Sequence, residues 1–459
     1  MPPILALSLG TALTLWLVRK DAAVRGKLAP ALRIPFIWLL IISSRPVAEW
    51  LNFGGGDSET GGNPMDATIQ FVLIAAAFFV LRRRGFPLNA WPSLNKAYFI
   101  LFLYFAISMI WAPYSFVACK RLFKEFGQIL IILVILTEND PVAAIKILAS
   151  RSAIVLFPLS VVLIKYYPAY GRSFSVGGIP MVTGVTTQKN SLGEICAVFG
   201  LVLLWDFLDA WSERPRGERL KFLFPRLVVL GLGIWLLLWS ESKTSLLALL
   251  IGSGIFLALG HRMIQPVARS CAKLIFAGIS VGLLVTYSWT SVMAPLLHAV
   301  GRNETLTERT HIWTSVLKQD INSWFGCGYY SFWLAKEEDV WLDWPGHFKP
   351  HSAHCGYLEM YLDGGYVGCF FLFIFLFATC WRLANLCAGT DRFPRVLFAL
   401  AMISLVLNFS EVYFFRLDLS WFFLVLAAMG SHPYLFEQIQ KPAETTVETG
   451  PGGELAEAT

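Results

Sequence analysis

A succession of long apolar runs limits this chain to one broad class of fold. About thirteen runs of roughly 15–22 residues, each long enough to cross a bilayer, divide the 459 residues. Mean hydropathy is +0.60 and only 15% of the residues are charged, which excludes a soluble globular protein. The runs lie near 3–18, 31–44, 65–81, 97–111, 126–136, 152–164, 191–208, 222–239, 244–259, 272–287, 362–381, 395–408 and 417–429.

The pattern predicts an all-α, polytopic integral membrane protein of about 12–13 transmembrane helices. We expect a single transmembrane domain over 1–440, with one long hydrophilic loop at about 291–361 inserted between spans. The polar, acidic segment 441–459 is predicted to be a disordered cytoplasmic tail. No basic residue precedes the first run and no small-residue cleavage site follows it, so we interpret it as a retained helix.

Lysine and arginine gather on alternate flanks of the runs, and this asymmetry predicts the orientation. If the loop with Arg19 and Arg25 is cytoplasmic, so are the RRR at 82–84 and the loop at 213–221. The N-terminus and the 291–361 loop then face outward. The formal charge of +6 is therefore mostly a topological signal, and we expect no nucleic-acid partner.

Eight cysteines are scattered along the chain without CxxC or Cys/His zinc spacing, so a metal site is not expected. Cys327 and Cys355 share the outer loop, where they either pair in an oxidising compartment or stay free thiols. No cofactor is expected.

The 291–361 loop is too rich in tryptophan and tyrosine for a solvated coil. NETLTERTHIWTSVLKQDINS predicts an amphipathic helix capped by Thr307, with an apolar face of Ile312, Trp313, Val316, Leu317 and Ile321. The loop aromatics either stack on sugar rings or belong to a membrane-interface belt.

Several cations lie at predicted outer helix ends, where the positive-inside rule disfavours them. They are Lys120, Arg121, Lys124, Arg172 and Lys189. A bound anion would offset their charge, and snorkelling to lipid phosphate is the other explanation. As a group they favour an anion site.

Three motifs carry a resemblance to a known superfamily. ERTHIW, WFGCGYYSF and HSAHCGYLEMYLDGGYVG resemble the O-antigen ligases, O-antigen polymerases and related exopolysaccharide polymerases. That superfamily has an Arg followed four residues later by Leu or Trp, and a His-Asn/Ser/Gln-(nine residues)-Gly-x-x-Gly signature. These correspond to Arg309 with Trp313, and to His354 with Gly365 and Gly368. TTQKNSLG around Lys189 and SESKTS around Lys243 resemble shorter motifs of the same proteins. One departure is Cys355, where the family usually has Asn, Ser or Gln.

The resemblance implies a GT-C-like membrane glycosyltransferase at the periplasmic face of the bacterial inner membrane. Such an enzyme takes a glycan from undecaprenyl pyrophosphate, without nucleotide sugar or metal, and transfers it with inversion to an acceptor hydroxyl. The acceptor is either a growing glycan, for a polymerase, or a lipid A core, for a ligase. The lipid bilayer is the other expected partner.

This chemistry assigns candidate roles. Arginine binds phosphate oxygens bidentately, so Arg309 is the leading diphosphate ligand, against a surface ion pair with Glu304 or Glu308. The secondary diphosphate candidates are Arg121, Arg172, Lys189, Lys243 and Arg416. Histidine is mostly neutral and basic near pH 7, so His354 is the candidate base or acceptor-orienting group. His351 and Trp313 are secondary candidates, and Gly364, Gly365 and Gly368 are assigned to close helix packing.

Two other functions compete with transfer. A transporter or flippase of lipid-linked oligosaccharides would use the same cations to guide a diphosphate, but it would be expected to carry charges deep in its spans and often pseudo-repeats. A sensor or structural membrane protein would need no clustered histidine and arginine.

Overall fold

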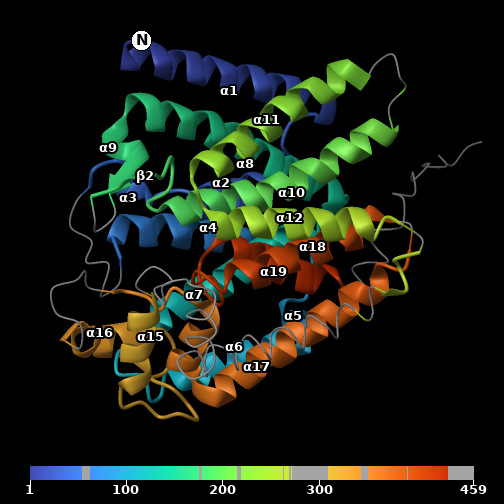
Figure 1. Cartoon of the computed structure of the whole chain (residues 1–459). Coiled ribbons are helices and arrows are strands. Elements are labelled where there is room, and N and C mark those ends of the chain that lie inside the picture. The colour runs from blue at the N-terminus through green and yellow to red at the C-terminus, as the bar shows by residue number, and fades with distance from the viewer. Residues whose placement is uncertain are drawn as a thin grey trace, which may run out of the picture.

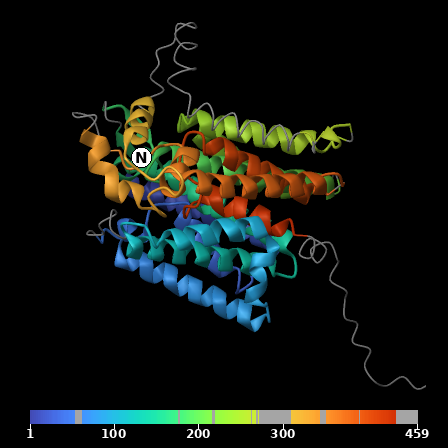
Figure 2. The ribbon, with the colours of Figure 1, turned by 90° about the horizontal axis from the view of Figure 1, so that it is seen from below.

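The computed structural model describes residues 1–53, 62–174, 178–213, 215, 219–261, 263–267, 270, 309–342, 350–389 and 391–432. Its helices run side by side as an elongated bundle (Figures 1 and 2). Among the described residues, six helices are long and apolar enough to cross a membrane. The chain is therefore a mostly helical, polytopic membrane protein, as its apolar runs predict.

The elements of the first half are α1 (Pro3–Arg25), α2 (Arg33–Ile42), α3 (Val47–Trp50), α4 (Pro64–Arg83), η1 (Leu88–Ala90), α5 (Trp91–Leu94), α6 (Lys96–Ser108), α7 (Ser115–Leu136), α8 (Pro141–Tyr166) and α9 (Pro168–Gly171). The antiparallel pair β1 (Arg172–Phe174) and β2 (Pro180–Val182) follows, with Ser173 opposite Met181. The second half contains α10 (Lys189–Glu213), α11 (Arg219–Trp239), α12 (Lys243–Ala258), α15 (Arg309–Lys318), α16 (Phe332–Leu342), α17 (Gly356–Leu386), α18 (Arg392–Leu407) and α19 (Leu419–Gly430).

Every predicted apolar run except 272–287 overlaps one of these helices; that run and the tail 441–459 are outside the described residues. In α7 and α8 the helix continues well beyond the run, through charged residues. α8 begins eleven residues before position 152, because Arg151 and Lys146 inside it form ion pairs with Asp21 and Asp209. α7 includes Arg121, which the sequence places in a junction between spans. Paired charges inside a helix interrupt the hydropathy signal without interrupting the helix.

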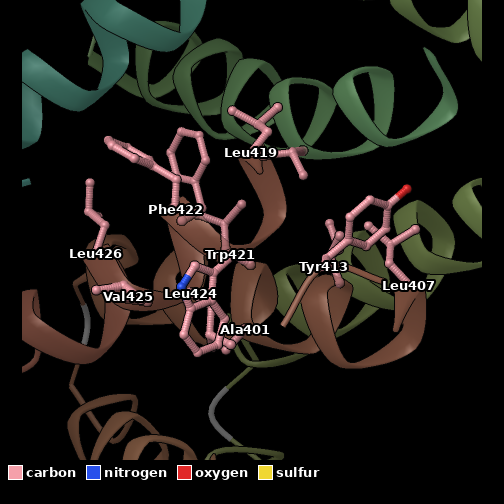
Figure 3. Packing of buried hydrophobic residues seen from close by; sticks show 14 of the residues in the cluster. Ala401, Leu407, Tyr413, Leu419, Trp421, Phe422, Leu424, Val425 and Leu426 are labelled. Carbon is pink, nitrogen blue, oxygen red and sulfur yellow. The ribbon is translucent and has the colours of Figure 1, made fainter. Parts of the chain in front are cut away.

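The core of the bundle is formed by α18, α19 and α10. All twelve residues of α19 are buried, and Figure 3 shows Trp421, Phe422 and Leu424 pointing to different sides of this helix. A helix that is apolar all round is stable only when surrounded by other helices. α19 is therefore a central element, and most of the segment before it, 408–418, is buried or partly buried, with Phe409 exposed.

The described part of the hydrophilic loop forms α15 and α16, which Figures 1 and 2 place together at one end of the bundle. Ile312 and Val316 of α15 are buried and Trp313 is nearly so, as the predicted apolar face requires, whereas Leu317 is exposed. The predicted cap, Thr307, lies outside the described residues. These two helices therefore lie against this end of the bundle.

α17 is kinked where the glycine motif lies. Gly365 has a φ of +61°, and beyond it the Tyr366 and Val367 N–H groups donate to the Ser323 and Trp324 carbonyls at 2.9 and 3.0 Å. A Cβ on Gly365 would lie 2.4 Å from the Trp324 carbonyl. Gly368 faces Tyr104 of α6 instead, at 3.1 Å from its ring. Gly365 thus allows the 323–324 segment to pack against α17, and Gly368 allows α6 to pack against it.

Gly365→Ala should destabilise the protein by about 1–3 kcal/mol from backbone strain alone, with the steric clash added. Gly254→Ala in α12 is the matched control, because its Cβ would enter open space and its φ is helical. The thermal midpoint in detergent measures both. Equal midpoints for the two variants would contradict the role assigned to Gly365.

Candidate active site

A polar cavity of about 580 Å³ lies at the end of the bundle that α15 and α16 cover. Its walls come from α7, α16, the start of α17, and the segments before α10 and α19. Among the described residues they are Tyr114, Arg121, Thr187, Gln188, Ser191, Tyr330, Trp333, Leu334, Glu337, His351, Ser352, Glu359, Glu411, Val412, Tyr413, Arg416, Leu417 and Asp418. The sequence separation of these segments explains why no local motif outlines the cavity.

Tyr330 lies between two guanidinium groups in the cavity wall. Arg121 of α7 stacks on its ring at 3.6 Å from the centroid, and Arg416 stacks at 3.8 Å. Arg416 also pairs with two carboxylates one turn apart on α17, Asp363 at 2.8 Å and Glu359 at 3.3 Å. Stacking on Tyr330 fixes the plane of the Arg121 guanidinium, and stacking together with ion pairing fixes that of Arg416.

The two arginines differ in how their charge is balanced. Burial by itself lowers the pKa of Arg416, but Asp363, Tyr330 and Glu359 together raise it above its usual value. Arg416 therefore keeps its charge and forms structural ion pairs with Asp363 and Glu359. No carboxylate of the described residues forms an ion pair with Arg121, whose charge is available to an anion entering the cavity.

Glu411 connects the two residues of the predicted motifs. One carboxylate oxygen accepts from Arg309 at 2.9 Å and from the Asn190 amide, and the other contacts Nδ1 of His354 at 3.3 Å. The Glu411 side chain is only 9% exposed, so these bonds form with little competition from solvent. Holding Nδ1 against a carboxylate places the proton there and leaves Nε2 of His354 as the basic nitrogen.

Backbone hydrogen bonds fix the segment that carries Glu411. Asn408 Oδ1 accepts from the Tyr413 and Phe414 N–H groups at 3.0 and 2.9 Å. The Gly356 N–H, at the start of α17, donates to the carbonyls of Asn408 and Glu411 at 2.8 and 2.9 Å. A Cβ on Gly356 would lie 2.0 Å from Asn408 Oδ1, so only glycine allows this contact. The start of α17 and the turn before α19 therefore form one unit.

Left-handed backbone conformations gather at this unit. Tyr330, His354 and Phe415 have φ values of +58°, +48° and +54°. Such conformations cost about 1–3 kcal/mol each in bulky residues and cluster where a side chain must point in one direction. Here they direct Tyr330 between the arginines and His354 toward Glu411.

The two candidate histidines occupy different positions. His351 lies in the cavity wall, is 67% exposed and pairs through Nδ1 with Glu337. His354 is 26% exposed, does not line the cavity, and reaches it through Glu411. Both rings thus have Nδ1 against a carboxylate, and they differ in exposure: His354 is the more buried and His351 the more accessible.

Cys355 is the N-cap residue of α17 and makes no side-chain capping hydrogen bond. Asn and Ser are strong N-cap residues, so the amide or hydroxyl usual at this position fits the role of a cap. It is Glu411, not Cys355, that contacts the His354 ring. Burial raises the pKa of the Cys355 thiol to about 11, and both Cys355 and Cys327 are free.

The remaining predicted site residues lie around the cavity, not in it. Trp313 donates from Nε1 to the Ala353 carbonyl at 2.8 Å and so anchors the segment before His354. Arg172 bonds to the Ile164 carbonyl at 3.0 Å at the start of β1. Lys189 and Lys243 are the first residues of α10 and α12. Of the predicted cations, only Arg121 and Arg416 are among the residues lining the cavity.

Asp418 is a further acid of the wall that sequence reasoning did not select. The Ser420 N–H is shared between Asp418 at 3.1 Å and Glu194 of α10 at 2.8 Å, so two carboxyl groups meet here. Burial raises the pKa of Asp418 to about 6. Below that pH the pair loses a negative charge next to the cavity.

Sequence reasoning also missed Glu411, Tyr330, Glu359 and Asp363. A signal for the last two was present, because carboxylates four residues apart in an apolar run require a buried cation as partner. Glu411 had a weaker signal in SEVYFFRLD, a segment in which the sequence predicted only Arg416 as a site residue.

Comparisons with known proteins point to one family for part of the chain. Residues 228–374, which contain Arg309, His354 and Gly365, match the family model described as O-antigen ligase. The Exopolysaccharide production protein ExoQ of Rhizobium meliloti is 25% identical over 280 residues. That alignment covers 58% of this chain and 60% of ExoQ. No solved structure matches.

The fold and the cavity define a multi-pass membrane protein with a charged site at one end of its bundle. The matches support the resemblance of the sequence motifs: residues 228–374 match the O-antigen ligase family, and the chain is a distant relative of an exopolysaccharide production protein.

Proposed function

We propose that the protein is a membrane glycosyltransferase that moves a glycan from undecaprenyl pyrophosphate to an acceptor hydroxyl. The observation that carries the proposal is Arg121, a cavity arginine without a carboxylate partner among the described residues, stacked on Tyr330 next to the Glu411–His354 pair. An available guanidinium fits a diphosphate, and a carboxylate-oriented imidazole fits a hydroxyl. The cavity wall thus carries Arg121 for the diphosphate and Glu411, which contacts His354, on the acceptor side.

The reaction has a simple balance. The bond from the anomeric carbon to the diphosphate oxygen breaks while the acceptor oxygen bonds to that carbon from the opposite face. Arg121 stabilises the charge that develops on the diphosphate. Nε2 of His354 takes the hydroxyl proton, and Glu411 stabilises the imidazolium. Arg309 pairs with Glu411 and is not among the residues that line the cavity. Its role is therefore to position Glu411 and to add positive potential at longer range.

The name of the Rhizobium meliloti relative supports chain extension, so we favour a glycan acceptor over a lipid A core. The positive-inside pattern supports a periplasmic location for the cavity, in the bacterial inner membrane. None of the proposed steps uses a nucleotide sugar or a metal ion. Transfer by purified protein should therefore continue in EDTA.

Arg121→Gln should weaken binding of the lipid diphosphate about 10–100-fold, because it removes charged hydrogen bonds worth about 1.5–3 kcal/mol. Arg121→Lys keeps the charge but loses the planar fork, and should recover only part of the loss. The measurement is the concentration dependence of transfer from an undecaprenyl-pyrophosphate glycan in detergent.

Lys124→Gln is the matched control, since Lys124 lies one turn further along α7 and lines a separate apolar cavity. Normal donor affinity in Arg121→Gln, or an equal loss in Lys124→Gln, would contradict the proposed diphosphate site.

A further inference from the structure

A second group of charges lies at the other end of the bundle, all of them largely buried except Lys20, which is exposed. It consists of Lys20 and Arg25 of α1, Arg151 of α8, Arg226 of α11, and the carboxylates Asp21 and Asp206, and is called the distal cluster below. Asp206 follows Asn190 by sixteen residues on α10, which places the cluster about 24 Å from the candidate active site. The cluster is therefore no part of that site.

Ion pairs link the cluster across four helices. Asp21 forms an ion pair with Arg25 at 3.0 Å and accepts a hydrogen bond from Arg151 at 2.8 Å. Asp206 accepts from Arg226 at 2.7 Å and also from Arg25. The Arg25, Arg151 and Asp206 side chains are each less than 10% exposed. These charges are held in place and largely removed from water.

Two cavities open on either side of Arg25 and Arg226, which line both of them. The larger, about 320 Å³, is also lined by Lys20 and by apolar residues such as Ile154, Leu203 and Val229. The smaller, about 220 Å³, extends toward Lys146, Asp209 and Glu213. A cationic wall thus continues directly into an apolar one.

The positive charge exceeds the negative charge here. The cluster has four cations and two carboxylates among the described residues. Including its neighbours Lys146 and Arg392 with Asp209 and Glu213 gives six cations against four carboxylates. The three arginines are largely buried and share only two carboxylates, and Lys20 is exposed beside them. A bound anion next to Arg25 and Arg226 would offset this excess.

We propose that the distal cluster binds the phosphate headgroup of an anionic phospholipid. Lys20, Arg25 and Arg226 hold the phosphate, and an acyl chain follows Ile154, Leu203 and Val229. A lipid fits better than a free phosphate because the larger cavity is lined mainly by apolar side chains. Basic pockets between transmembrane helices bind anionic headgroups in the same way.

The cavity has a route from the bilayer. Figure 1 shows α1 at the edge of the bundle, with α11 beside its C-terminal half. Most of α1 is exposed, including Leu5, Leu9 and Leu13. A lipid can therefore enter between α1 and α11 from the side.

The test uses the full chain, delipidated in detergent. Phosphatidylglycerol should raise the thermal midpoint and remain bound in native mass spectra, whereas phosphatidylethanolamine and inorganic phosphate should do neither. Lys20→Gln should weaken phosphatidylglycerol binding about fivefold, because one cation near an anionic headgroup contributes roughly that factor. Arg226→Gln should weaken it more.

Arg19→Gln is the matched control, because Arg19 is the neighbouring exposed cation on α1 but does not line the cavity. Lys20 forms no ion pair with the cluster, so its variant should fold even if Arg226→Gln does not. Equal binding of the two phospholipids, equal losses in Lys20→Gln and Arg19→Gln, or stabilisation by inorganic phosphate alone would each overturn the proposal.

Discussion

His354→Ala should lower the rate of glycan transfer by about 10²–10⁴-fold, the usual contribution of a general base. Glu411 holds Nδ1 of this ring, so the loss follows from the missing Nε2 and not from a displaced helix. The assay is extension of an undecaprenyl-pyrophosphate glycan in vitro at matched protein levels. Donor binding should change little, because Arg121 and Arg416 form the diphosphate side of the cavity.

His351→Ala is the decisive comparison for this prediction. His351 is exposed and lies in the cavity wall, so accessibility alone would favour it as the base. The lower exposure of His354 and its contact with the Glu411–Arg309 pair favour His354, and we expect His351→Ala to lose far less activity. A fully active His354→Ala enzyme together with an inactive His351→Ala enzyme would reverse the assignment.

Arg416→Gln should destabilise the protein by about 3–5 kcal/mol, the typical cost of removing one partner from a buried ion pair. Asp363 and Glu359 would lose their shared cation while their side chains stay 2% and 5% exposed. The stacking on Tyr330 would be lost as well. The midpoint of thermal unfolding in detergent reports the effect.

Two further variants test the cause of the loss expected for Arg416→Gln. Adding Asp363→Asn to Arg416→Gln should restore part of the stability, because it removes one of the unpaired charges. Lys336→Gln disrupts the exposed pair with Asp339 and should cost less than about 1 kcal/mol. A midpoint for Arg416→Gln as high as that for Lys336→Gln would show that the buried pairs add little.

The membrane class and the positions of the helices could be predicted because hydropathy is a local property of the chain. The start of α8 could not, since Arg151 and Lys146 look like a helix end until Asp21 and Asp209 are known to face them. At the site, the motifs located His354, Arg309 and Gly365 within the chain. They gave no information on which cation stays unpaired, because Arg121 and Arg309 look alike until their neighbours are known.

The sequence by itself determined that this is a helical membrane protein, and its motifs resemble the O-antigen ligase family that residues 228–374 match. Only the tertiary structure decided that Glu411 joins Arg309 to His354, and that Arg121 and Arg416 share Tyr330. The physical reason is separation along the sequence. Hydropathy and motif spacing are properties of residues within about one helix length of each other. The contacts of Glu411 and Arg121 instead connect residues 57 to more than 200 positions apart, and depend on how α7, α10, α17 and the turn before α19 pack together.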